Sequence, residues 1–170
     1  TMDQAGAVTF KGDPLTLVGN EVHVGDTAPD FTVVGEGLSA VKLSDFAGQV
    51  VVVSAVPSLD TQVCEEQTKR FNEEAAGLNA KVLTVSLDLP FAQGRFCGAF
   101  NIGNTQTVSD YKEREFGQAY GILIKELALL ARAVFVIDTD GKISYREIVN
   151  EVTDHPNYDA VLAAAREVGA

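Results

Sequence analysis

The sequence predicts an α/β protein built on a mixed β-sheet covered by helices. Three apolar, β-branched runs have the pattern of strands that are buried on both faces: residues 50–56, 82–87 and 133–137. Helical patterns between these runs imply crossover connections and parallel strands. The turn at residues 138–141 joins the third run to residues 143–149 as a hairpin, which adds an antiparallel edge to the sheet.

The other elements follow from local signals. A small N-terminal hairpin is expected because two apolar stretches, residues 8–10 and 15–18, flank a turn that contains glycine and proline. A short strand is expected over residues 31–34. Helices are expected at about 63–78, 91–99 and 110–120, the last capped by Ser109 or Asp110, and from residue 157 onward.

Length, composition and charge exclude several classes of protein. The 170 residues fit one domain over residues 1–170, with residues 1–20 as an N-terminal hairpin extension. Apolar residues make up 46% and charged residues 22%, which excludes a disordered chain. No stretch approaches the roughly 20 apolar residues of a membrane span, and no export signal is recognisable, so a cytoplasmic location without membrane binding is expected. The net charge of −11 repels phosphate backbones and anionic lipids, which argues against nucleic-acid binding.

The two cysteines and two histidines limit the chemistry further. Neither histidine stands at zinc-ligand spacing from a cysteine or from the other histidine, so no metal site is expected. No cofactor is expected either. Cys64 and Cys97 are too far apart to form a CxxC redox loop. In a reducing compartment both begin as thiols. An inert buried pair and a reactive pair are both open at this point.

Cys64 has the position expected of a reactive thiol. It stands in the first turn of the helix that follows the strand over residues 50–56, and ligands bind α/β sheets at the carboxyl ends of strands. The free N–H groups and the positive dipole at a helix start favour the nucleophilic thiolate. Thr61 is expected to cap this helix and to place its hydroxyl beside the sulfur. The alternative is a core cysteine, because Cys64 lies on the apolar stripe of the helix.

The charges around Cys64 indicate that a cation is needed. Glu65 and Glu66 follow the cysteine directly, and their negative charge disfavours a thiolate. Arg132 is the best candidate for the compensating cation, because it begins a strand that is buried on both faces and a buried arginine needs a partner. A purely structural ion pair is the alternative for this residue. Arg95, close to Cys97, is a second candidate cation.

Three segments of the chain together resemble the peroxiredoxin family, and within it the bacterial thiol peroxidase subgroup of atypical two-cysteine enzymes. The loop from Pro57 to Cys64 matches the pattern Pro-x-x-x-Thr/Ser-x-x-Cys, with Thr61 at the hydroxyl position. Residues 88–97 resemble the region of the resolving cysteine, and residues 131–138 resemble the arginine-bearing strand. The resemblance covers nearly the whole chain.

The resemblance implies a thioredoxin-like fold, a homodimer and a role in antioxidant defence. It implies that Cys64 is the peroxidatic cysteine, which attacks a hydroperoxide and becomes a sulfenic acid. Cys97 is then the resolving cysteine, which forms an intramolecular disulfide that thioredoxin reduces. The resemblance further implies that Thr61 orients the peroxide, Pro57 shields the sulfenic acid, and Arg132 stabilises the thiolate and the transition state.

Some features leave alternatives open. A peroxide-sensing switch would use the same disulfide without turnover, and a structural disulfide would leave Cys64 with ordinary reactivity. A glutathione-type oxidoreductase is disfavoured because residues 64–67 lack a CxxC or CxxS pattern. Gln62 departs from the family, where proline is usual, and it frees a backbone N–H in the active-site loop. If Cys97 lies within a helix, a disulfide requires α-carbons within about 7 Å, so partial unwinding is expected.

Overall fold

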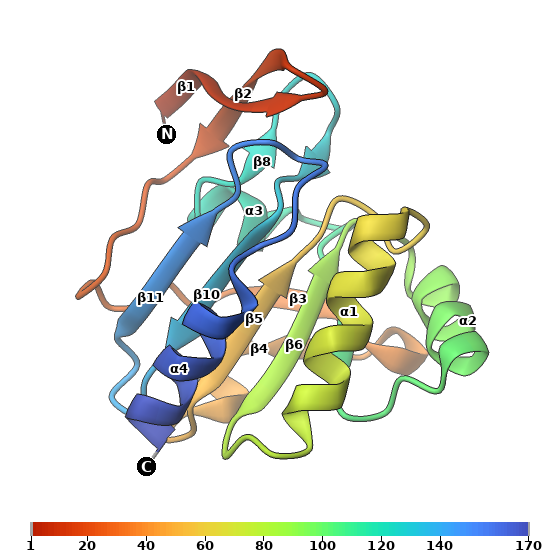
Figure 1. The fold of residues 1–170 in the computed structure, drawn as a ribbon, viewed down its shortest axis with the longest axis vertical. Coiled ribbons are helices and arrows are strands. Elements are labelled where there is room, and N and C mark those ends of the chain that lie inside the picture. Colours follow the sequence, from red (N-terminus) through yellow and green to blue (C-terminus); the bar gives the residue numbers. More distant parts are fainter. Residues whose placement is uncertain (1, 170) are drawn as a thin grey trace.

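The computed structural model describes residues 2–169 and places a seven-stranded mixed sheet at the centre (Figure 1). From one edge to the other, its strands are β11 (Ile143–Ile148), β10 (Ala133–Ile137), β5 (Val51–Ala55), β6 (Lys81–Ser86), β7 (Gln106–Ser109), β3 (Thr32–Val34) and β4 (Ala40–Lys42). A smaller sheet contains, in order, β1 (Met2–Phe10), β2 (Asp13–Gly19), β8 (Leu123–Ile124) and β9 (Leu129–Leu130). Two short 3-10 helices, η1 (Glu36–Leu38) and η2 (Leu43–Phe46), flank β4.

The connections between the strands confirm the predicted mixed α/β class. The helices are α1 (Gln62–Ala75), α2 (Pro90–Phe100), α3 (Glu115–Ala119) and α4 (Tyr158–Gly169). The neighbours β5, β6 and β7 are parallel and are joined through α1 and α2, whereas β10 pairs antiparallel with both β5 and β11. Within residues 2–169, no helix combines the length and the apolar character that crossing a bilayer requires.

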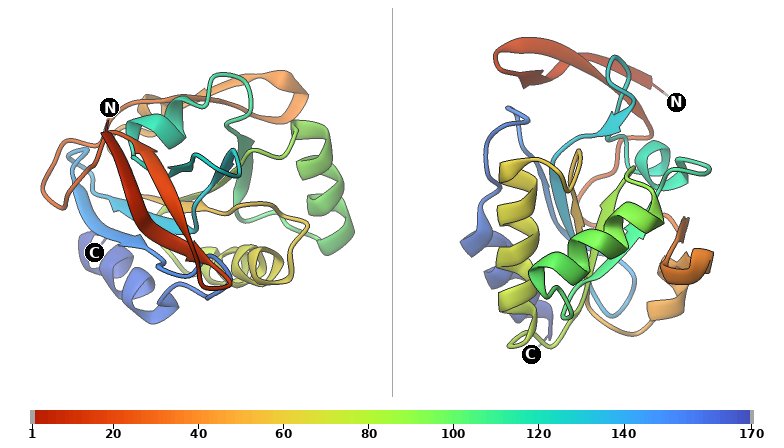
Figure 2. Two further views of the ribbon diagram at one scale, coloured as in Figure 1. Left: turned by 90° about the horizontal axis from the view of Figure 1, so that it is seen from above. Right: turned by 90° about the vertical axis from the view of Figure 1, so that its right-hand side faces the viewer.

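Different elements cover the two faces of the sheet, and the side chains of β5 alternate between them. Val52 lies in a core that also contains Phe71 of α1 and Val161 of α4. Val53 lies in the core on the other face, together with Phe116 of α3. Figure 2 shows α1 and α4 on one side of the sheet and α3 on the other. Because successive strand residues point to opposite faces, a strand covered on both sides requires the uninterrupted apolar run that the sequence contains.

The N-terminal hairpin predicted from the sequence is present and is longer than expected. β1 and β2 pair antiparallel, and β2 also pairs with β8 (Figure 1). The side chains of Val8, Leu15 and Leu17 are buried in the same core as α3 and one face of the large sheet. Burial of each of these side chains contributes about 1.5 to 3 kcal/mol to the packing of the hairpin onto the rest of the protein.

The structure differs from the sequence prediction at the shortest elements. The strands β4, β7, β8 and β9 were not predicted, because two to four residues are too few to show a period. The helix expected over residues 110–120 is wrong in its first half, since only Glu115–Ala119 is helical. The Asp110 carboxylate accepts hydrogen bonds from the N–H groups of Phe116 (3.1 Å) and Gly117 (2.8 Å). This long-range cap folds the intervening residues into a turn, in which Arg114 takes a left-handed conformation.

Asp110 is expected to make the fold more stable as the pH falls, which is the opposite of the usual effect of a carboxyl group. Burial of this carboxyl group raises its pKa to about 6. The native state therefore holds a proton between about pH 4 and pH 6 that the unfolded chain releases, so this group stabilises the fold as the pH falls from 7 to 4. The pKa difference corresponds to a contribution on the order of 3 kcal/mol.

We expect Asp110→Asn to remove this part of the pH dependence, because an amide does not titrate. The measurement is the free energy of unfolding in urea at several values between pH 4 and pH 7. The advantage of the wild-type chain over the variant should grow as the pH falls. An identical pH dependence in both chains would contradict the role of Asp110.

Candidate active site

Cys64 lies where the sequence places it, in the first turn of α1, after the loop that leaves the carboxyl end of β5. The residue is 0% exposed and belongs to a small apolar cluster with Val56, Leu59 and Phe96. Pro57 is also buried, at the start of this loop. The sulfur therefore sits at the positive end of a helix and is shielded from water. A thiolate at this position needs a fixed donor, because water does not solvate it.

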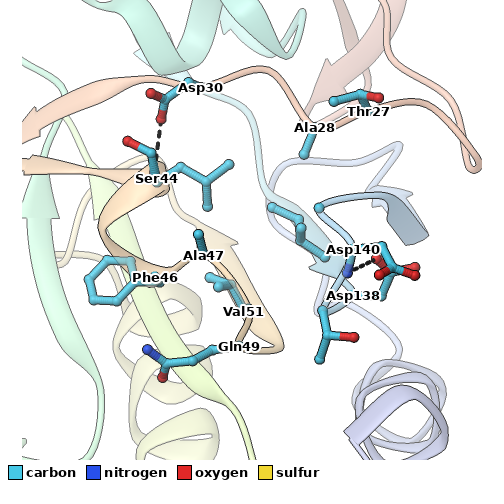
Figure 3. A pocket seen from close by; sticks show the side chains of 15 residues that line it. Thr27, Ala28, Asp30, Ser44, Phe46, Ala47, Gln49, Val51, Asp138 and Asp140 are labelled. Carbon is cyan, nitrogen blue, oxygen red and sulfur yellow. Dashed lines mark hydrogen bonds between the residues drawn. The ribbon is translucent and has the colours of Figure 1, made fainter.

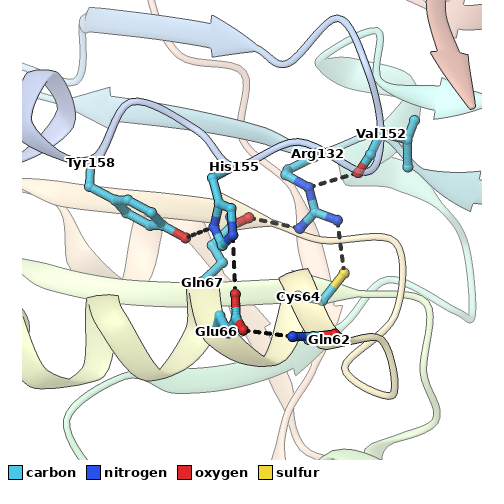
Figure 4. A network of polar contacts seen from close by, with 8 residues as sticks. All are labelled: Gln62, Cys64, Glu66, Gln67, Arg132, Val152, His155 and Tyr158. Atoms are coloured by element: carbon cyan, nitrogen blue, oxygen red, sulfur yellow. Dashed lines mark hydrogen bonds and ion pairs between the residues drawn. The ribbon is translucent and has the colours of Figure 1, made fainter. Parts of the chain in front are cut away.

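Arg132 provides this donor (Figure 4). The side chain is 2% exposed, and its Nη2 donates to Cys64 Sγ at 3.3 Å. Its Nη1 donates to Gln67 Oε1 at 2.9 Å, and its Nε donates to the carbonyl oxygen of Val152 at 2.9 Å. These three hydrogen bonds go to the sulfur and to uncharged oxygens rather than to a carboxylate, so they do not support the alternative of a structural ion pair. Two neutral acceptors hold the guanidinium in place, and its charge faces the sulfur.

Gln67 is a residue of this site that the sequence analysis missed. It is buried one turn after Cys64 on the inner side of α1, and its Nε2 donates to Ser54 Oγ of β5 at 2.7 Å. This bond fixes the amide so that its oxygen faces Arg132, which agrees with the bond from Nη1. A polar residue three positions after Cys64, next to the apolar stripe of a helix, is the signal that could have identified it.

The two glutamates beside Cys64 are paired with other groups. Glu66 Oε2 lies 3.1 Å from His155 Nε2, and Glu66 Oε1 accepts a hydrogen bond from Gln62 Nε2 at 3.2 Å (Figure 4). Glu65 pairs with Lys69 at 3.5 Å. The expected conflict between these acids and a thiolate is therefore reduced, because each carboxylate has a partner outside the sulfur site. The role of His155 in this network was not foreseen from the sequence.

Thr61 has the predicted position but not the predicted contact. It is the N-cap residue of α1, yet its Oγ1 makes no hydrogen bond to the helix N–H groups and donates to the carbonyl oxygen of Ser58 at 3.2 Å. The expectation of a side-chain cap was wrong because the loop turns back on itself here. The Asp88 carboxylate stabilises this turn by accepting bonds from Ser58 Oγ and Leu59 N–H, both at 2.8 Å. Asp88 thereby ties the loop before Cys64 to the segment that leads into α2.

Cys97 lies within α2, as expected, and its partly buried side chain packs against the apolar cluster that contains Cys64. Both cysteines are free thiols. The Sγ atom of Cys97 is 3.4 Å from Thr107 Oγ1. A cavity of about 420 Å³ borders Cys97 and residues 102–107.

Arg95, the second candidate cation, does not have the position that this role requires. It is exposed on α2 and borders a shallow hollow with Asp60, Phe96 and Phe100. The guanidinium in contact with the sulfur belongs to Arg132 instead.

Another cavity, of about 280 Å³, lies at the opposite end of β5 (Figure 3). Its walls include Phe46 of η2, Gln49 and Val51 before and at the start of β5, and Asp138 and Asp140 in the turn between β10 and β11. None of the catalytic residues predicted from the sequence borders this cavity. Ligands of α/β sheets bind at the carboxyl ends of strands, whereas this cavity lies at the amino end of β5. The Cys64 end of the strand is therefore the better candidate for the functional site.

The arrangement at Cys64 suits two-electron thiol chemistry. A sulfur at a helix start, next to an oriented guanidinium, has the surroundings of a nucleophilic thiolate. The same guanidinium is placed to stabilise negative charge on an oxygen that approaches the sulfur. Among residues 2–169, no group of three or more His, Cys, Asp or Glu side chains has the arrangement of a metal site.

The chain is similar in sequence and in structure to known proteins. The sequence pattern of the Redoxin family matches residues 23–162. A thiol peroxidase from Oceanobacillus iheyensis is 57% identical, over 92% of this chain and 96% of its own length. A thiol peroxidase from Bacillus subtilis is 55% identical, over 94% of this chain and 96% of its own. The crystal structure of a peroxiredoxin-like protein from Aquifex aeolicus superposes with a TM-score of 0.91 at 46% identity, covering 99% of both chains.

Proposed function

This chain belongs to the peroxiredoxin family, in its thiol peroxidase group, and is a thiol-dependent peroxidase with a thioredoxin-like fold; from this we propose that Cys64 is the cysteine that attacks the peroxide. The observation that supports this proposal best is the 3.3 Å contact between Arg132 Nη2 and Cys64 Sγ in a site closed to water. Cys97 is partly buried, and its Sγ lies beside a threonine hydroxyl rather than a cation, which suits the second, resolving position.

In the proposed first step, the Cys64 thiolate attacks the terminal oxygen of a hydroperoxide. An S–O bond forms, the O–O bond breaks, and the departing alkoxide or hydroxide takes a proton and leaves as an alcohol or water. The sulfur loses two electrons and becomes a sulfenic acid. Arg132 stabilises the thiolate before the attack and the charge on the leaving oxygen during it.

In the proposed second step, Cys97 resolves the sulfenic acid. The Cys97 sulfur attacks the Cys64 sulfur, an S–S bond forms, and water leaves. Because Cys64 lies in the first turn of α1 and Cys97 inside α2, we infer that one or both helices unwind locally when the disulfide forms. Prompt resolution protects the sulfenic acid from further oxidation.

The remaining assignments concern the loop and the partners. Pro57 is buried at the start of the loop and shields the sulfenic acid, while the exposed Thr61 hydroxyl swings from Ser58 to orient the peroxide. Thioredoxin is the proposed reductant of the disulfide in a cytoplasmic homodimer. The exposed apolar side chains of Leu89 and Phe91, at the start of the helix that carries Cys97, support docking of a protein partner here.

The test is the rate at which hydrogen peroxide or an alkyl hydroperoxide oxidises Cys64 in Cys97→Ser, measured in the folded chain and in denaturant. The unfolded chain supplies the reference for an unassisted thiol. We expect the folded chain to react at least about 1,000-fold faster, as one oxyanion-type donor and a helix start together provide. Equal or slower reaction in the folded chain would overturn the assignment of Cys64. The same comparison in Thr61→Val tests the hydroxyl, whose loss should slow the folded chain about tenfold.

A further inference from the structure

The N-terminal hairpin meets the loop after β11 next to Arg132. The N–H of Thr9 on β1 donates to the carbonyl oxygen of Asn150 at 2.7 Å, and the N–H of Val152 donates to the carbonyl oxygen of Thr9 at 2.8 Å. These two main-chain bonds form a short bridge between segments more than a hundred residues apart in sequence. The loop after β11 therefore takes its position from the hairpin as well as from the large sheet.

Val152 links this bridge directly to the active site. Its N–H is held by the hairpin, and its carbonyl oxygen accepts the hydrogen bond from Arg132 Nε at 2.9 Å. Its side chain is buried in the same core as Val8 of the hairpin. The Arg132 main chain is bound to this loop too, because its carbonyl oxygen accepts the N–H of Val149 at 2.9 Å. A shift of the hairpin would thus move the acceptor that orients the guanidinium.

The Glu151 carboxylate fastens the two segments together. Its Oε1 accepts bonds from the hairpin, from Thr9 Oγ1 and Gly12 N–H, both at 2.9 Å. Its Oε2 accepts bonds from its own loop, from Thr153 N–H at 2.9 Å and Thr153 Oγ1 at 2.7 Å. These bonds, above all those from Thr153, hold the pKa of Glu151 well below its usual range. Because donors face both ends of the side chain, only a carboxylate, in which both oxygens accept, satisfies all four bonds.

We propose that Glu151 is a positioning residue for peroxide reduction: it fastens the N-terminal hairpin to the loop whose Val152 carbonyl orients Arg132 against Cys64. The inference rests on the proposed function, since it concerns the orientation of the group that activates Cys64. It assigns the hairpin, which lies outside the large sheet and carries no cysteine, a part in catalysis. Glu151 acts only through Val152 and Arg132.

The test uses Glu151→Gln in the Cys97→Ser background. Glutamine keeps the shape of the side chain, but its N–H₂ group is a donor at a position where the neighbouring donors need an acceptor. The matched control is Glu126→Gln. Glu126 accepts bonds from Thr16 N–H and Thr16 Oγ1, both at 2.8 Å, and so fastens the same hairpin next to β8 through bonds that involve neither Val152 nor Arg132. The readouts are the rate of Cys64 oxidation by hydrogen peroxide and the pH midpoint of Cys64 alkylation by iodoacetamide.

We expect Glu151→Gln to slow oxidation of Cys64 about three- to tenfold and to move the alkylation midpoint to higher pH, while Glu126→Gln leaves both unchanged. The effect should disappear when Arg132→Met is already present, because Glu151 acts through that side chain. If Glu151→Gln has the same oxidation rate and alkylation midpoint as Glu126→Gln, the inference is overturned. An equally large effect of Glu151→Gln in the Arg132→Met background also overturns it.

Two further measurements keep the result unambiguous. If Glu151→Gln does not fold, Thr9→Val removes one hairpin donor without introducing a new one, and it should slow oxidation about two- to threefold; a wild-type rate in this variant overturns the inference. If Cys64 of the parent Cys97→Ser chain reacts no faster folded than unfolded, the proposed function fails. A fast parent with an equally fast Glu151→Gln refutes the positioning role alone.

Discussion

Arg132→Met is expected to slow the oxidation of Cys64 by hydroperoxide by about 100- to 1,000-fold, the loss typical of one oriented donor in a closed site. The substitution removes the positive charge that lies 3.3 Å from the sulfur and leaves a buried thiol that water cannot solvate. The rate is measured by rapid mixing of Cys97→Ser with peroxide, with and without Arg132→Met. Gln67 and Val152 each lose a donor, so unfolding should also become easier by about 1 to 3 kcal/mol for each buried acceptor.

The matched control for this experiment is Arg95→Met. It removes an arginine that is exposed on α2, close in sequence to Cys97, and leaves the contacts of Arg132 intact. The control should react at the parent rate. A parent rate in Arg132→Met together with slow reaction in Arg95→Met would transfer the role of activating cation to Arg95. Circular dichroism at the temperature of the assay shows whether each variant is folded.

Cys97→Ser is expected to reduce one equivalent of peroxide per chain and then to stop. In the proposed mechanism the first oxidation uses Cys64 and Arg132, whose contact the substitution leaves in place. In the proposed mechanism turnover requires the second thiol. Steady-state consumption of peroxide with thioredoxin should therefore fall at least about 100-fold, and dimedone should trap the sulfenic acid on Cys64. Mass spectrometry of the intact chain after one and after many equivalents of peroxide distinguishes sulfenic from sulfinic acid.

A suitable control is Thr107→Val, which removes the hydroxyl 3.4 Å from Cys97 Sγ and keeps both thiols. It should retain turnover, so a loss confined to Cys97→Ser reports the thiol itself. Sustained turnover in Cys97→Ser would contradict the resolving role of Cys97. Conversely, a wild-type chain that forms the disulfide but turns over no faster than Cys97→Ser would be a peroxide-sensing switch.

The sequence by itself predicts the parts of this protein that depend on local patterns. Uninterrupted apolar runs such as 133–137 identify strands covered on both faces, because side-chain burial alternates along a strand. The position of Cys64 at a helix start follows from the change of period after the strand over Val51–Ala55. A lone arginine at the entrance to a buried strand marks Arg132, because such a charge needs a partner.

Only the tertiary structure decided which groups meet at the sulfur. The contact of Arg132 with the sulfur, and its acceptors Gln67 and Val152, depend on hydrogen-bond directions between segments that are distant in sequence. Such directions are set by how the elements pack, and no local period encodes them. For the same reason the Thr61 hydroxyl, expected to cap α1, turns out to face the loop. The contact of the N-terminal hairpin with the loop whose Val152 carbonyl binds Arg132 likewise cannot be predicted from the sequence pattern.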